Sequence, residues 1–182
     1  MSLKNPIRKP YQMPKPLYWK VADEDRKKNV ESMWWARPIK QGLLSATSDR
    51  EREAMQKGYT LREKVLGFGG NAVCLDLYDE DYENIMQRGQ FFYGSSYKRS
   101  GKVGRCHQNS CYLFCANPDR CTIATGYALS EDGIWRQHSW VVQPLATKLR
   151  VWETTPIKRV AYFGFVMTKK ESEEFCKKVL MY

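Results

Sequence analysis

The chain contains six cysteines, which are candidate nucleophiles, but only two histidines that could act as their base. A thiol becomes a nucleophile when its pKa is lowered and a base lies within hydrogen-bond reach, with a third group to orient that base. Cys106 follows a loop that contains Gly101 and Gly104, and it opens a predicted helix over 106–116. Because the positive end of a helix dipole favours a thiolate, Cys106 is the candidate nucleophile.

His138 is the candidate base. His107 is adjacent to the nucleophile on the predicted helix, and neighbouring helical side chains point about 100° apart. His138 lies in a predicted strand over 134–142, and Glu153 ends the next one, over 149–153. Two antiparallel strands would place the carboxylate beside the imidazole. Together the three residues predict a Cys–His–acid site that needs no metal or other cofactor.

Each of these residues also has a purely structural interpretation. Cys106 would be a buried free cysteine, His138 a hydrogen-bonded sheet histidine, and Glu153 a surface carboxylate on an edge strand. The coincidence of all three in the order that a thiol mechanism requires favours the chemical interpretation.

The remaining cysteines are expected to pack or to compete weakly. Cys74 and Cys176 lie in apolar patterns, and Cys111 and Cys115 lie one turn apart in the predicted helix, where small core residues are expected. Cys121 begins a predicted strand and is the expected competitor for thiol reagents. A zinc site is the chemical alternative, because the Cys-x3-Cys spacing in the helix suits zinc, but packing is the preferred interpretation.

Three sequence blocks share their order with a known superfamily. They are Gly104-Arg-Cys106, His138-Ser-Trp140-Val-Val and Val151-Trp-Glu153-Thr-Thr155. This arrangement resembles the papain-like and transglutaminase-like cysteine enzymes, over about residues 90–167. The resemblance implies Cys106 as nucleophile, His138 as base and Glu153 as orienting acid. It also implies that Trp140 is the aromatic residue beside the histidine.

Two positions depart from the family pattern. Glu153 stands where the transglutaminase-like family usually has an aspartate, so the orienting distance differs by one methylene. Ser100 stands where papain-like enzymes place a glutamine that donates to the oxyanion. The backbone amide of Cys106 is one expected donor. The second donor is left open among Ser96, Tyr97, Gln90 and Asn109.

The implied reaction is thiol-dependent acyl transfer on an amide. With water as the acceptor the protein would be a peptidase or a glutamine deamidase, and with an amine it would be a transglutaminase. Hydrolysis is the default expectation because it needs no second substrate site. Lys102 and Arg105 lie in a basic loop over 98–105, so we expect them, with Trp140, to contact a protein or peptide substrate of acidic character.

Helical patterns precede strand patterns along the chain. Capping boxes at Ser48 and Thr60 predict two short helices separated at Gly58, and Asp79–Arg88 predicts a third. Strands are expected over 121–129, 134–142, 149–153 and 160–167, before a last helix that Thr168 opens. We therefore expect an α+β fold in which the nucleophile helix packs on an antiparallel sheet of about four strands, with a papain/transglutaminase-like core.

Residues 1–45 form a separate arm by composition, and 46–182 form the predicted catalytic domain. The arm is rich in proline and aromatic residues, and its first 40 residues hold ten Lys or Arg against four Asp or Glu, six of the ten net positive charges. We expect its tyrosines and tryptophans to dock on the globule. The alternative function is a non-catalytic binding module on the same fold, whose basic arm binds nucleic acid or an acidic protein.

The expected compartment is the cytoplasm. No run approaches the ~18 apolar residues of a membrane span, and the sequence MSLKNPIRKP has no apolar stretch like that of a secretory signal. We therefore expect no membrane partner and reduced thiols.

Overall fold

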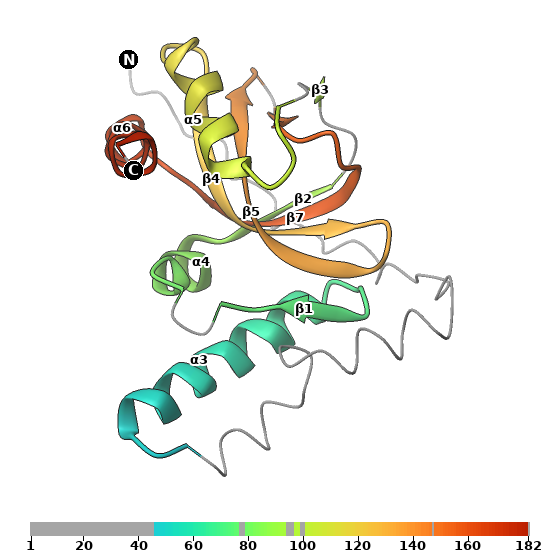
Figure 1. Ribbon diagram of the computed structural model, residues 1–182. Helices are drawn as coiled ribbons and strands as arrows, with labels where there is room; N and C mark the ends of the chain where they lie inside the picture. The colour runs from blue at the N-terminus through green and yellow to red at the C-terminus, as the bar shows by residue number, and fades with distance from the viewer. Residues whose placement is uncertain (1–45, 77–78, 94–96, 99–100, 147, 182) are drawn as a thin grey trace, which may run out of the picture.

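A computed structural model describes residues 46–182 with the exception of 77–78, 94–96, 99–100, 147 and 182 (Figure 1). The predicted arm lies outside the described residues. The helices are α3 Asp49–Leu66, α4 Tyr82–Arg88, α5 Cys106–Cys115 and α6 Lys169–Leu180. The strands are β1 Ala72–Cys74, β2 Gln90–Tyr93, β3 Tyr97–Lys98, β4 Thr122–Ser130, β5 Ile134–Pro144, β6 Leu149–Glu153 and β7 Arg159–Val166. The fold is α+β, as expected.

The described sheet has seven strands, so the expectation of about four is wrong. Its order is β2-β7-β4-β5-β6-β3, and β1 also pairs with β5. The pairs of β1 with β5 and of β3 with β6 are parallel, and the others are antiparallel. The four longer strands coincide with the predicted ones. The additional strands β1, β2 and β3 have two to four residues each, which is too short for an alternating pattern to reveal them.

The first described helix is continuous, and the predicted break at Gly58 is wrong. Ser48 caps α3 by accepting from the Glu51 amide, as the capping box predicts. Gly58 is buried on the same face as Leu61 and Val65, and the helix continues through it. Gly67 follows the last turn and its amide returns to the Glu63 carbonyl.

The central strand β4 alternates between large and small residues. Ile123, Tyr127 and Leu129 are buried in the main core, which also holds apolar residues of α3, α4, α5 and α6. The opposite face carries Ala124 and Ala128, which pack in a second cluster with aromatic rings from β2, β5 and β7. Small residues on β4 therefore leave room for large side chains from the neighbouring strands.

The edge of β5 that faces away from β4 is shared by two partners. β1 pairs with residues 134–136, and β6 pairs with residues 141–144. Between them, at 137–140, no strand of the described chain pairs with this edge. Figure 1 shows α5 lying along β4 and β5, with α6 beside it. None of the described helices is long and apolar enough to cross a membrane.

Candidate active site

Cys106 lies at the start of α5, against the open stretch of the β5 edge. Its thiol shares a hydrogen bond with the His138 side chain, and the backbone amides of Ser139 and His107 donate to its sulfur. Burial alone would raise the pKa of the thiol, but these hydrogen bonds and the charge of His138 outweigh burial and lower it. The N-terminus of α5 therefore contacts β5 at residues 137–140, between the stretches that pair with β1 and with β6.

The start of α5 has no side-chain cap, in contrast to α3 and α6. Its N-cap residue, Arg105, makes no capping hydrogen bond, and the first turn holds no acidic residue. Gly104 has a φ of 75°, in the left-handed region that glycine adopts most readily, and this turn delivers Cys106 to the helix start. The uncapped amides of the first turn are left to interact with an anion at or beside the sulfur.

His138 lies between the thiol and the acid. Its Nε2 is 3.0 and 3.1 Å from the two carboxylate oxygens of Glu153, which leaves Nδ1 as the ring nitrogen for Cys106. Burial would lower the pKa of His138, but the hydrogen bonds to Cys106 and Glu153 raise it. The imidazole is 1% exposed, so its protonation depends on these two partners and little on solvent.

Glu153 is a fully buried carboxylate at the end of β6. Besides His138, it accepts hydrogen bonds from the Thr155 amide and hydroxyl, both at 2.8 Å, and from the Tyr162 hydroxyl at 2.8 Å. Burial would raise its pKa, but these donors and His138 hold the pKa at about 2. The carboxylate is thus ionised at neutral pH and can stabilise an imidazolium.

Two aromatic rings flank the imidazole. Trp140 stacks at 6.3 Å and an interplanar angle of 19°, and Tyr162 at 6.3 Å and 28°. Trp140 is fully buried, and its Nε1 has no hydrogen-bond partner within the described residues. Trp140 therefore supports His138 by packing, and we do not assign it the substrate contact that its sequence position suggested.

Asn109 and Gln90 are not available as the second oxyanion donor, because one is already hydrogen-bonded and the other is too far away. The Asn109 amide donates to the backbone carbonyls of Lys102 at 2.8 Å and Thr154 at 3.1 Å, so both of its hydrogens are engaged. Gln90 is exposed on β2, separated from β5 by β7 and β4, about 14 Å away at the usual strand spacing. Ser96 and the Tyr97 side chain, like Ser100, lie outside the described residues.

His107 has a structural role that sequence alone does not reveal. Its Nδ1 is 2.7 Å from the Ser139 hydroxyl, which donates to Thr125 on β4 at 3.1 Å. Its ring packs edge-on against Phe175 of α6 at 5.8 Å. Burial, followed by the charge of His138, lowers the pKa of His107, so it anchors α5 on the sheet as a neutral ring.

The other thiols differ from Cys106 in access or in pKa. Cys121 is buried and donates to the Asn117 carbonyl, and burial raises its pKa, so it is a weaker competitor than its position suggested. Cys115 is exposed, which corrects its assignment as a core residue, and burial and Cys176 raise its pKa. Among the described residues, no three His, Cys, Asp or Glu side chains are grouped so that they could hold a metal ion.

Lys102 and Arg105 are exposed in the loop that precedes α5. In the described part of the chain neither side chain forms an ion pair, so both are available to an acidic group near Cys106. The Lys102 backbone is fixed by Asn109, whose amide oxygen accepts from the Lys102 amide at 3.2 Å.

We compared the chain with known proteins. Neither protein-family models, nor curated proteins, nor solved structures match this chain.

Proposed function

We propose that this protein is a thiol-dependent acyl-transfer enzyme that acts on an amide, with Cys106 as nucleophile, His138 as base and Glu153 as orienting acid. The observation that carries the proposal is the continuous chain of hydrogen bonds from the Cys106 thiol through His138 to a buried, ionised Glu153. Such a chain holds a thiolate beside an imidazolium, which is the reactive form of a cysteine nucleophile.

The geometry also supports a core like that of the papain-like and transglutaminase-like enzymes. A helix that begins with the cysteine packs on the sheet, and the histidine and the acid follow on adjacent antiparallel strands. Glu153 reaches His138 although it replaces the usual aspartate, because Thr155 and Tyr162 hold its carboxylate in place.

The proposed reaction has two stages. The Cys106 thiolate attacks the carbonyl carbon, and the resulting oxyanion is stabilised by uncapped amides at the start of α5. His138 gives its proton to the leaving nitrogen as the C–N bond breaks, which leaves a thioester on Cys106. His138 then accepts a proton from water as the water attacks the thioester carbonyl. The C–S bond breaks, the carboxylic acid leaves, and the Cys106 thiolate is restored beside the His138 imidazolium. Hydrolysis, by a peptidase or a deamidase, is the proposed outcome, and transfer to an amine is the less favoured one.

The test is acylation by an activated ester, p-nitrophenyl acetate. We expect a burst of p-nitrophenolate, the added mass of one acetyl group on Cys106, and slow hydrolysis of that acyl group. His138→Ala should abolish the burst, whereas His107→Asn should retain it. Adding a primary amine and looking for the amide product distinguishes transfer from hydrolysis. A burst that survives in Cys106→Ala would contradict the proposal.

A further inference from the structure

Arg159 is a basic residue that lies near the site and that the proposed mechanism does not use. It begins β7, where the register against β4 shifts between Leu129, which pairs with Ala161, and Ser130, which pairs with Arg159. This irregularity skips one residue of β7. Bulges of this kind re-aim a side chain next to functional sites.

The shift turns Arg159 to the face of the sheet that carries His138. Alternate residues of a strand point to the same face of the sheet, so Ser130 lies on the same face as position 126 of β4. Gly126 pairs with His138 on β5, so the Ser130 and His138 side chains lie on one face. The guanidinium of Arg159 donates to the Ser130 hydroxyl, which confirms the orientation. Without the shift, Ser130 would pair with residue 160, and the Arg159 side chain would lie on the opposite face, which packs against the helices.

Arg159 differs from its neighbour Arg136 in lacking a carboxylate partner. Arg136 also donates to Ser130, at 3.1 Å, but it is neutralised by Asp132 through two hydrogen bonds of 3.0 and 2.8 Å. Arg159 forms no ion pair in the described part of the chain, and its Nε is a buried donor without a partner. A partly buried guanidinium is costly when no anion accompanies it.

Arg159 lies within electrostatic range of the catalytic groups. Burial lowers the pKa of Arg159, whereas the negative charges of Glu153 and Cys106 raise it, and no hydrogen bond or ion pair joins Arg159 to either residue in the described part of the chain. The oxygens of Glu153 instead accept from His138, Thr155 and Tyr162. Despite its burial, an arginine remains charged at neutral pH. A planar donor without an ion-pair partner, on the face of the sheet that carries His138, is suited to bind a carboxylate.

We propose that Arg159 binds a carboxylate of the substrate beside Cys106, so that the protein prefers acyl substrates with an acidic group near the scissile amide. This inference depends on the proposed function, since it assigns the substrate class of the same site. The carboxylate can belong to an acidic side chain or to a chain terminus, and both present the same chemistry to the guanidinium.

Three alkylating probes of one skeleton test the proposal. They are the N-iodoacetyl derivatives of glutamine amide, which is neutral, of glutamate α-amide, with a side-chain carboxylate, and of glutamine, with a terminal carboxylate. In each reaction the Cys106 sulfur forms a bond to the methylene carbon as the carbon–iodine bond breaks and iodide leaves. The rate of Cys106 labelling is measured by mass spectrometry on the full chain.

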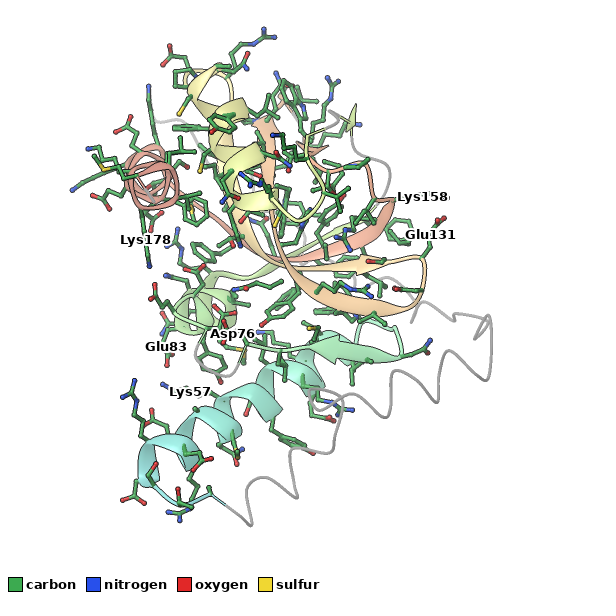
Figure 2. The ribbon with its side chains drawn as sticks, viewed as in Figure 1. Lys57, Asp76, Glu83, Glu131, Lys158 and Lys178 are labelled. Carbon is green, nitrogen blue, oxygen red and sulfur yellow. The ribbon has the colours of Figure 1, made fainter. Side chains whose placement is uncertain are left out.

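We expect one acidic probe to label faster than the neutral probe, and which one does so identifies the source of the carboxylate. Arg159→Gln should reduce the acidic-to-neutral rate ratio about tenfold, since a hydrogen bond to a charged group is lost. Arg159→Lys should retain part of the preference. Lys158→Gln is the matched control, because it removes the same charge one residue away, from a side chain 63% exposed and paired with Glu131 (Figure 2).

Two results would overturn the inference. One is an acidic-to-neutral ratio that is the same in Arg159→Gln as in the unaltered chain. The other is an equal loss of preference in Lys158→Gln, which would mean that overall charge is responsible. The neutral probe shows whether Arg159→Gln remains folded, since its rate should not change. If that probe fails to label Cys106 ahead of the other thiols in the unaltered chain, the proposed function itself fails.

Discussion

Glu153 shows how a buried charge is stabilised at the level of single residues. His138, Thr155 and Tyr162 all donate to it, so its carboxylate has little unsatisfied hydrogen-bonding capacity. A buried carboxylate with such partners is ionised, whereas one without them would be protonated. The sequence identifies Glu153 by its spacing from His138, but Tyr162 comes from a strand on the far side of β4, and no local pattern predicts that contact.

The depressed pKa of Glu153 leads to a prediction about acid stability. The pKa falls from an ordinary 4.5 to about 2 on folding, so this group stabilises the native state fully above pH 4.5. That contribution, about 3 kcal/mol at most, is lost as the pH falls through 2. In urea titrations, Glu153→Gln should therefore flatten the loss of unfolding free energy between pH 4.5 and pH 2.5.

The exposed Glu174 provides the control for this experiment. Glu174→Gln should leave the acid limb of the stability profile unchanged. An acid limb as steep in Glu153→Gln as in the unaltered chain would show that Glu153 does not carry this dependence.

Asn109 connects the loop before Cys106 to the end of β6, which makes it important at the level of elements. Its side chain hydrogen-bonds to the Lys102 backbone and to the Thr154 carbonyl, so it fixes the loop that precedes Cys106. Asn109→Ala should cost about 1–3 kcal/mol of unfolding free energy, because backbone groups lose their partners. It should also slow alkylation of Cys106, since the loop is no longer held.

Asn117 offers a matched control at the other end of the same helix, where its amide donates to the Leu113 carbonyl. Asn117→Ala should lower stability without changing the alkylation rate. Equal effects of the two variants on that rate would mean that Asn109 acts only through overall stability.

Two glycines test different physical constraints on the elements of the site. A Cβ on Gly164 would lie 2.1 Å from the Thr125 carbonyl oxygen and 2.8 Å from Cη2 of Trp140. Gly164→Ala should therefore destabilise the fold by more than about 2 kcal/mol and displace the ring beside His138. Gly104 has open space around it but a φ of 75°, so Gly104→Ala should cost only about 1 kcal/mol. Chemical denaturation measures both, and equal costs would contradict this distinction.

The longer elements could be predicted from the sequence because their signals are local. Thr168 and Glu171 form the predicted capping box of α6, and four strands lie within one or two residues of their expected ends. The short strands β1, β2 and β3 could not be predicted, because pairing partners far along the chain define them. Neither could the bulge that re-aims Arg159, since it depends on the register between β4 and β7.

For the molecule as a whole, the proposed site does not account for the positive net charge or for the N-terminal arm of residues 1–45. The net charge is +10, and much of it belongs to residues 1–45, whose role stays a prediction. If the arm docks through Trp19, Trp34 and Trp35, deletion of residues 1–45 should lower the melting temperature. If the arm serves the alternative function, truncation should leave stability unchanged and abolish nucleic-acid binding that weakens steeply with salt. Unchanged stability together with unchanged binding would exclude both roles.

The central claim is that Cys106 is a thiolate because His138 and Glu153 make it one. The most direct measurement is the rate at which each cysteine reacts with iodoacetamide at pH 6, mapped by mass spectrometry. We predict that Cys106 reacts first, ahead of the exposed Cys115, and that His138→Ala slows it by about tenfold or more, since each unit of pKa lowers the thiolate fraction tenfold. Glu153→Gln should slow it less. If Cys106 reacts no faster than Cys115, or if His138→Ala leaves its rate unchanged, the active-site account is wrong.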